Sequence, residues 1–158
     1  NGRVPVIGGA GGNHTARAVF WASEAAAAGA DGIVSVTPMY NQPSPDGLLR
    51  HFSAIAEATD LPMIVYNNPS RTGSDLDVST IQRLSEIPKV AGLQEASSNF
   101  GKIAKLMATL PRDFAVFSGN AEGSSPIWFM RHSDGNYYGN GQYGGVVNKG
   151  AVFRMTPP

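Results

Sequence analysis

The sequence contains no cysteine, and this excludes a disulfide framework, a thiolate zinc site and a cysteine nucleophile. Charged residues are also few, at 15% of the chain, and they balance at 12 basic and 12 acidic side chains. Such a chain has no electrostatic preference for nucleic acid or for an anionic membrane surface. No apolar run approaches the roughly 20 residues that a membrane-spanning helix needs. We therefore expect neither nucleic acid nor a membrane as a partner.

Other functional signals are absent as well. The histidines His14, His51 and His132 are far apart and lack metal-ligand spacing. The segment GGAGG at 8–12 lacks the Lys-Ser/Thr of a phosphate-binding loop, so a tight turn after a strand is the better interpretation. We predict no metal and no cofactor. The opening residues NGRVPVIGG lack a signal peptide and an initiator methionine, which suggests a cytoplasmic protein with a missing upstream segment.

What the sequence does contain is a regular alternation of two kinds of segment. The first kind is a short apolar run, at Val4–Ile7, Ile33–Val36, Met63–Tyr66, Val90–Leu93 and Phe114–Phe117. The second kind has apolar residues at helical spacing, at 16–29, 46–59, 78–87 and 100–110. Strand and helix alternating in this way are typical of βα repeats on a parallel sheet. The apolar runs are continuous, which predicts burial on both faces of that sheet.

The helical periods also predict where single side chains lie. Asp77 or Ser79 is expected to cap the third helix, because short polar side chains accept hydrogen bonds from the first free backbone N–H groups. His51 is expected on an exposed face of the second helix. Lys102 and Lys105 are expected on the surface of the fourth helix.

Each apolar run opens into a polar loop that is rich in glycine, proline, serine or asparagine. The loops are GGAGGNHT, TPMYNQPSPDG, YNNPSRTG, QEASSN and SGNAEG. Polar groups gathered after the carboxyl ends of parallel strands mark the ligand-binding face of barrels and open sheets. Five βα units are clear, whereas a full (β/α)8 barrel takes about 250 residues. The predicted fold class is therefore α/β, an incomplete (β/α)8 TIM barrel.

The end of the chain differs in composition from the rest. Residues 131–158 contain six glycines and three tyrosines, and they lack a helical or strand period of useful length. Such composition is typical of irregular, low-complexity segments. We predict a partial barrel domain at 1–130 and an irregular Gly/Tyr/Asn-rich tail at 131–158.

Four stretches taken together carry a resemblance to a known family. They are GRVPVIGG, ADGIVSVTPMYNQPSPDGLLRHFSAIAEATDLPMIVYNNPSRTG, GLQEAS and DFAVFSGN, within a segment that runs from about Gly2 to Phe129. In order and spacing they resemble the dihydrodipicolinate synthase / N-acetylneuraminate lyase family, class I lyases and aldolases on a (β/α)8 barrel. The resemblance implies that this chain covers roughly strands 3 to 7 of such a barrel, with their helices.

The resemblance also implies Schiff-base chemistry between pyruvate and a lysine on the sixth barrel strand. In GLQEAS this position is occupied by Gln94. A primary amine attacks the ketone, whereas an amide nitrogen is delocalised into its carbonyl and is not nucleophilic. Neighbouring Glu95 is interpreted as supporting the site by hydrogen bonding. The family's Gly-Thr-Thr-Gly-Glu loop, which supplies a relay threonine and contacts to the pyruvate carboxylate, is absent from the sequence.

Four further positions match residues of the family. Tyr66 resembles a tyrosine that relays protons at the Schiff base, and Tyr40 resembles one that reaches into a neighbouring subunit's site. Without the resemblance they read as a half-buried core tyrosine and an ordinary loop aromatic. Arg71 resembles the arginine that binds the carboxylate of aspartate semialdehyde with its planar guanidinium fork, and is otherwise a solvated loop arginine. Asn13 resembles a residue of a regulatory lysine site.

Two functions stay open at this point. The first is a lyase that condenses pyruvate with aspartate semialdehyde on the route to lysine, or another pyruvate-dependent aldolase of the family. The second is a non-catalytic remnant, or a binding or assembly module that keeps the barrel face without the nucleophile. Gln94 favours the second, so we expect this chain to be inactive. We also expect a homo-oligomer, because a partial barrel leaves strand edges unpaired.

Overall fold

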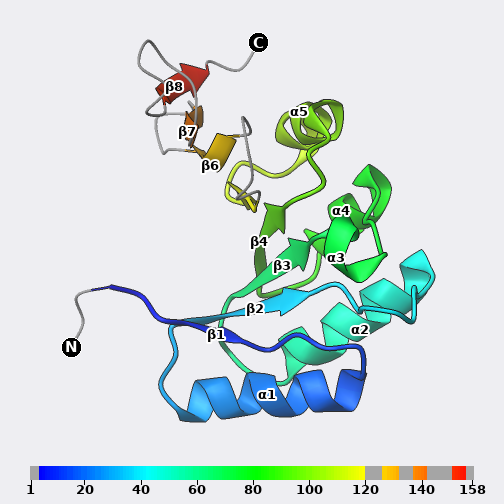
Figure 1. Ribbon diagram of the computed structural model, residues 1–158. Coiled ribbons are helices and arrows are strands. Elements are labelled where there is room, and N and C mark those ends of the chain that lie inside the picture. The colour runs from blue at the N-terminus through cyan, green and yellow to red at the C-terminus, as the bar shows by residue number, and fades with distance from the viewer. Residues whose placement is uncertain (1–3, 120–125, 132–136, 142–150, 156–158) are drawn as a thin grey trace.

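A parallel sheet flanked by helices forms the main body of the chain in a computed structural model, which describes residues 4–119, 126–131, 137–141 and 151–155. The sheet has the order β1-β2-β3-β4-β5. Its strands are β1 (Ile7–Gly9), β2 (Gly32–Val36), β3 (Met63–Asn67), β4 (Val90–Glu95) and β5 (Ala115–Ser118). The helices are α1 (Thr15–Ala27), α2 (Pro45–Glu57), α3 (Pro69–Thr72), α4 (Val78–Leu84) and α5 (Phe100–Thr109). Figure 1 shows the helices following one side of the curved sheet in chain order, so the predicted α/β repeat is confirmed.

The first strand begins later than predicted. Ladder pairing starts at Ile7, opposite Gly32, and not at Val4. Pro5 has no backbone N–H to give to a ladder. The N–H of Val6 donates to the Asp31 carboxylate at 2.8 Å, and the Val6 carbonyl accepts from the Asp31 backbone N–H at 2.8 Å, so Asp31 holds both backbone groups of Val6 just before the ladder begins. Pro5 and Asp31 therefore account for a ladder that begins only at Ile7.

The two faces of the sheet differ in burial. Ile33, Met63, Val65 and Leu93 lie on the face beneath the helices and are at most 1% exposed. The alternate positions, such as Ile64, are only half-buried. The expectation of burial on both faces is therefore met on one face only, because helices α1, α2, α4 and α5 flank the same side of the sheet (Figure 1).

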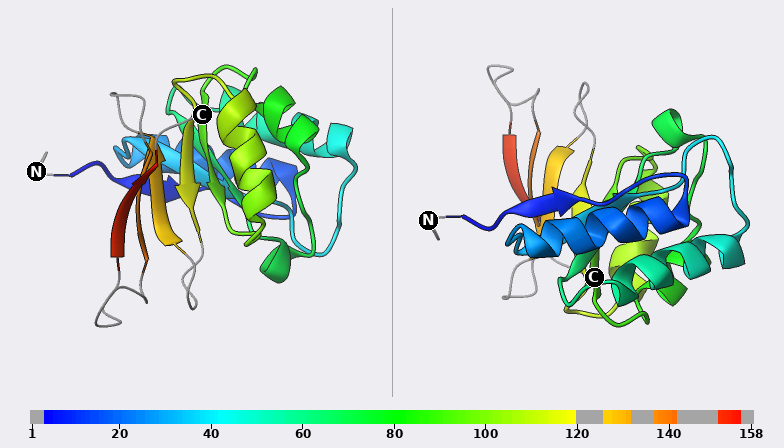
Figure 2. Two further views of the ribbon diagram at one scale, coloured as in Figure 1. Left: turned by 90° about the horizontal axis from the view of Figure 1, so that it is seen from above. Right: turned by 90° about the horizontal axis from the view of Figure 1, so that it is seen from below.

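A second, antiparallel sheet follows the parallel one. It consists of β6 (Pro126–Arg131), β7 (Tyr137–Gly141) and β8 (Ala151–Met155), and β6 lies against β5 (Figure 2). The prediction of an irregular tail is wrong for β7 and β8, where aromatic and β-branched residues favour strands despite the glycines. Arg131 ends β6, and residues 132–136, 142–150 and 156–158 of the tail lie outside the described residues. Within the described ranges, no helix has both the length and the hydropathy to cross a bilayer.

His51 is not exposed as predicted. Its side chain lies on the buried side of α2, where the residue is 4% exposed. Leu48 and Ile55 are buried on the same helix, three residues before His51 and four after it, so all three lie in one stripe. The helical spacing was therefore a sufficient signal for burial, and only the polarity of the imidazole pointed the other way.

Asp77 caps α4, and this confirms one of the two capping residues that the sequence offered. Its carboxylate accepts hydrogen bonds from the Thr80 backbone N–H at 2.7 Å and from the Ser79 hydroxyl at 2.8 Å. We expect Asp77→Ala to lower the free energy of unfolding by about 1 kcal/mol, because the N–H groups of the first turn lose their acceptor. Urea denaturation at neutral pH measures the loss, and Asp77→Asn, which keeps an acceptor, should recover most of it.

The same cap predicts a dependence on pH. The hydrogen bond from Thr80 and then that from Ser79 hold the pKa of Asp77 below its ordinary value of 3.8. A carboxyl group whose pKa is lower in the folded state stabilises the fold above pH 3.8, and this contribution is lost as the pH falls further. Asp77→Asn should lack that acid-dependent part. A curve for Asp77→Asn identical to that of the parent below pH 4 would contradict the assignment.

Candidate active site

The candidate site lies at the carboxyl ends of β3 and β4. The register of these strands pairs Tyr66 with Gln94, and in the next position Asn67 with Glu95. Side chains alternate between the two faces of a strand, so the two pairs point to opposite faces. Tyr66 and Gln94 are half-buried on the face without helices, whereas Asn67 and Glu95 are at most 1% exposed beneath the helices.

The hydroxyl of Tyr66 is held by a neighbour on its own loop. The Asn68 side-chain amide donates to the Tyr66 hydroxyl oxygen at 2.7 Å. The Asn68 side-chain oxygen in turn accepts from the Ser70 hydroxyl at 2.9 Å, inside the short helix α3. Asn68 was not singled out from the sequence, although it directly follows a strand end, which is where such groups gather.

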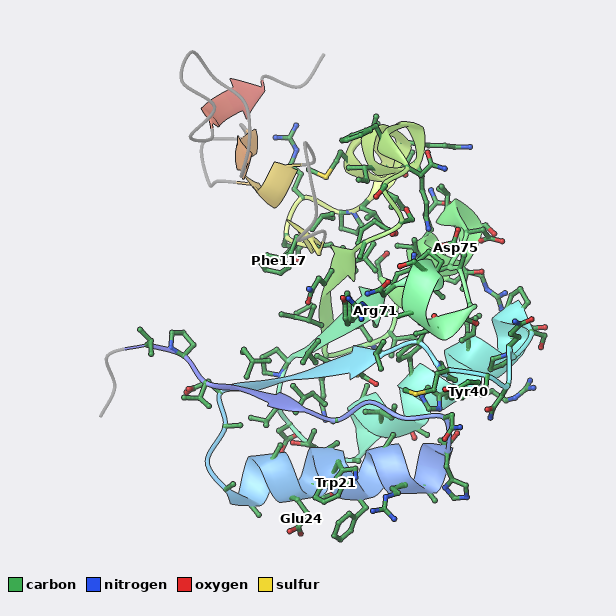
Figure 3. All side chains as sticks on the ribbon, viewed as in Figure 1. Trp21, Glu24, Tyr40, Arg71, Asp75 and Phe117 are labelled. Atoms are coloured by element: carbon green, nitrogen blue, oxygen red, sulfur yellow. The ribbon has the colours of Figure 1, made fainter. Side chains whose placement is uncertain are left out.

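The Gln94 side chain lies close to the end of the adjacent strand β5. It is in register with Phe117 of β5, which Figure 3 labels at that end of the sheet. A Cβ added at Gly119 would lie 3.1 Å from the Gln94 amide nitrogen and 3.0 Å from the Ala96 Cβ. The glycine therefore leaves the space that the Gln94 side chain uses.

Tyr40 and Arg71 lie on two loops that touch through their backbones. The Tyr40 N–H donates to the carbonyl of Thr72, next to Arg71, at 3.4 Å. The Tyr40 side chain is 88% exposed and its φ is 68°, a left-handed conformation that is uncommon for a bulky residue. Arg71 is exposed in α3 (Figure 3). Within the described residues, neither side chain forms a hydrogen bond with Tyr66 or Gln94.

Asn13 is connected to the Tyr40 loop and not to the strand ends. Its side chain is exposed, and its backbone carbonyl accepts a hydrogen bond from the Asn41 amide at 2.8 Å. The five predicted site residues thus fall into two groups, with Tyr66 and Gln94 in one. Tyr40, Arg71 and Asn13 form the other, which lies on connected loops.

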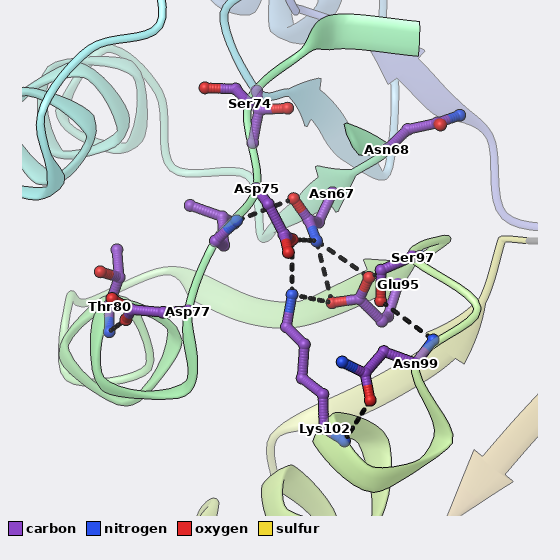
Figure 4. Close-up of polar contacts among 12 residues, drawn as sticks. Asn67, Asn68, Ser74, Asp75, Asp77, Thr80, Glu95, Ser97, Asn99 and Lys102 are labelled. Atoms are coloured by element: carbon purple, nitrogen blue, oxygen red, sulfur yellow. Dashed lines mark hydrogen bonds and ion pairs between the residues drawn. The ribbon is translucent and has the colours of Figure 1, made fainter. Parts of the chain in front are cut away.

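Beneath the site lies a closed polar network that Figure 4 draws. The Glu95 carboxylate accepts from the Asn67 side-chain amide at 2.9 and 3.0 Å and from the Ser97 backbone N–H at 2.8 Å. It also pairs with the Lys102 ammonium at 3.1 Å. The same ammonium lies 2.7 Å from Asp75. Glu95 is therefore hydrogen-bonded, as the sequence analysis expected, and α5 is joined through it to the ends of both strands.

Lys102 corrects one prediction from the sequence. It was expected on the helix surface, but its side chain is 7% exposed. Lys102 precedes Leu106 by four residues and so lies in the buried stripe of α5, and two carboxylates compensate the cost of burying its charge. An ammonium group paired with two carboxylates has no lone pair with which to attack a ketone. Lys102 also lies on the helix side of the sheet, away from Gln94, so it does not stand in for a nucleophile.

The other two described lysines, Lys89 and Lys105, do not approach Gln94 either. Lys89, at the opposite end of β4, donates to the Thr59 carbonyl at 2.8 Å and pairs with Asp60 at 2.9 Å. Lys105 is exposed on α5, and Lys149 lies outside the described residues. In the part of the chain that the structure describes, no three His, Asp or Glu side chains come together in a way that would hold a metal ion.

Comparison with known sequences identifies relatives. The sequence model of the Dihydrodipicolinate synthetase family matches residues 1–131. A 4-hydroxy-tetrahydrodipicolinate synthase of Methanosarcina barkeri is 45% identical over 126 residues, which cover 79% of this chain and 43% of the relative. The synthase of Aromatoleum aromaticum is 49% identical over 119 residues, which cover 75% of this chain and 41% of the relative. The chain therefore spans about two fifths of the length of these relatives.

Solved structures give the same result. The dihydrodipicolinate synthase of Bacillus anthracis matches with a TM-score of 0.74 and 39% identity, over 75% of this chain and 41% of the other. The chloride-inhibited synthase of Acinetobacter baumannii, complexed with pyruvate, matches with a TM-score of 0.73 and 44% identity, over the same shares. Both are TIM barrels, so the prediction of an incomplete (β/α)8 barrel is confirmed. The matched sequence, the parallel βα repeat and the strand-end site together show that this chain belongs to the Dihydrodipicolinate synthetase family.

Proposed function

We propose that this chain carries the pyruvate-facing part of a dihydrodipicolinate synthase-type lyase but does not itself form the Schiff base. This proposal rests on one observation. Gln94 lies beside Tyr66 at the strand ends, in the position to which the resemblance assigns the reactive lysine. A carboxamide donates and accepts hydrogen bonds but does not add to a ketone. None of the three described lysines lies at the carboxyl end of a strand.

The reaction of a lyase of this type is the condensation of pyruvate with aspartate semialdehyde. In it, Tyr66 relays protons, Arg71 binds the aldehyde's carboxylate, and Tyr40 completes a neighbouring subunit's site, all in a cytoplasmic homo-oligomer. Asn13 belongs to a regulatory site. The exposed positions of Tyr40 and Arg71 support roles toward groups outside this chain. The pyruvate complex of the Acinetobacter baumannii relative supports the ligand class.

A binding or assembly module is the second candidate function. It is favoured by the replacement of an amine by an amide at Gln94, while Tyr66 keeps its place and its hydrogen bond from Asn68. Such a site would hold a 2-oxo acid without a covalent bond. The exposed apolar residues Ile7, in β1, and Val6, just before it, support association with a further chain.

Trapping with borohydride tests the absence of Schiff-base chemistry. The chain is incubated with pyruvate, reduced with sodium borohydride and analysed by intact-mass spectrometry. We expect no reduced pyruvyl adduct, because an iminium ion needs a free amine and the described lysines lie elsewhere. The synthase of Methanosarcina barkeri, treated in parallel, is the positive control. An adduct on this chain at the level of the control would disprove the proposal, and peptide mapping would identify the lysine that carries it.

A further inference from the structure

His51 is a buried imidazole at the contact between α1 and α2. Its Nδ1 lies 2.9 Å from the hydroxyl oxygen of Thr15, the first residue of α1. Its Nε2 is buried and has no hydrogen-bond partner among the described residues, and it is the single buried side-chain nitrogen or oxygen there of which this is true. The ring packs edge-on against Phe52, with centroids 5.2 Å apart. Buried polar groups without a partner are rare in folded proteins and call for an explanation.

A positive charge on this ring is disfavoured for three reasons. Burial penalises the charged form and lowers the pKa of His51 from its ordinary value of 6.5. In addition, Thr15 begins α1, so the ring lies at the positive end of that helix dipole. Protonation would also place an N–H with no acceptor at Nε2.

Among the described residues, no charged side chain compensates for such a charge on the ring. The neighbours of His51 along its own helix face are Gly47, Leu48, Ala54 and Ile55, which are uncharged. The titratable and charged groups of α1 with its cap, of α2 and of the packed α4 are all exposed: His14, Arg17, Glu24, Asp46, Arg50, Glu57 and Arg83. None of these forms a hydrogen bond with the imidazole in the described residues. Asp46, the nearest carboxylate in sequence, pairs with Arg83 instead.

The first turn of α1 is linked to the Tyr40 loop. Asn13 precedes α1 by two residues, and its carbonyl accepts from the amide of Asn41, the residue after Tyr40. Movement at Thr15 would therefore reach this link. We propose that His51 is an acid-sensitive latch: its protonation releases the first turn of α1 from α2 and loosens the Asn13–Asn41 link that holds the Tyr40 loop.

Hydrogen exchange tests the latch. Amide protection of the α1 peptide is measured by mass spectrometry at pH 7.5 and 5.5, after correction for the intrinsic rates. Below pH 6.5 the released ring binds a proton more readily than the packed ring, whose pKa is lowered by burial, so acid favours the released state. Protection of α1 should thus fall between pH 7.5 and pH 5.5, by at most about tenfold, since pH 5.5 lies one unit below the ordinary pKa of 6.5. Amide protection of the α5 peptide should not fall between the same two pH values.

Two variants separate the latch from general acid effects. His51→Gln keeps a polar side chain that does not titrate, and it should abolish the fall in α1. His14→Gln removes an exposed imidazole next to the same helix and should retain the fall. If the fall persists in His51→Gln, the latch is wrong.

A measurement on the unmodified chain guards against a variant that does not fold. Imidazole nitrogen shifts are followed by NMR from pH 8 to pH 4.5. One histidine should titrate below 6.5, and it should remain in the spectra of His14→Gln and His132→Gln. Titration of every imidazole at or above 6.5 would overturn the proposal.

Discussion

Lys102→Met is expected to lower the free energy of unfolding by about 3–5 kcal/mol, the usual cost of removing one partner from a buried ion pair. The Glu95 carboxylate is 1% exposed and would lose its neutralising cation, while hydrogen bonds from Asn67 and Ser97 compensate only in part. Urea denaturation at pH 7 measures the change. The loss should remain at high salt, because a buried pair is screened much less than a surface pair.

Lys105→Met is the matched control for this prediction. Lys105 lies on the same helix but is exposed, so its replacement should change the free energy of unfolding by no more than about 0.5 kcal/mol. Adding Glu95→Gln to Lys102→Met removes the stranded charge and should recover part of the loss, as a double-mutant cycle would detect. A loss below about 1 kcal/mol for Lys102→Met would mean that the pair behaves as a surface ion pair, contrary to the geometry.

Gln94→Lys is expected to permit weak pyruvate trapping but no measurable condensation. An amine on the half-buried face beside Tyr66 can attack a ketone without further help. Turnover needs more, because proton relay and carboxylate binding require groups held within a fraction of an ångström. The sequence has no Gly-Thr-Thr-Gly-Glu loop to provide them.

Two assays on Gln94→Lys distinguish these steps. Borohydride trapping followed by intact-mass measurement detects the adduct, and a coupled assay with pyruvate and aspartate semialdehyde detects condensation. Gln94→Met is the matched control, since it has similar length but no amine. Product formed by Gln94→Lys above the level of the unmodified chain would show that the absent loop is dispensable.

Local patterns in the sequence determined the fold class and the outline of the site. Apolar runs and helical periods located five strands and four of the five parallel-sheet helices, because burial on a sheet or a helix face leaves a period that a short window detects. The cap at Asp77 is equally local, since its partner Thr80 is three residues away. The place of Gln94 at a strand end also required nothing beyond its own segment.

Only the tertiary structure decided which polar side chains are buried and what they contact. Lys102 reaches Asp75 across 27 residues, and His51 reaches Thr15 across 36. A period can place such residues in a buried stripe, but it does not reveal a partner on another element, and a charge is buried only when that partner is present. The start of β1 likewise depends on the distant Asp31 carboxylate. The β7 and β8 strands exist through pairing with each other and with β6, and that pairing is a property of the assembled sheet.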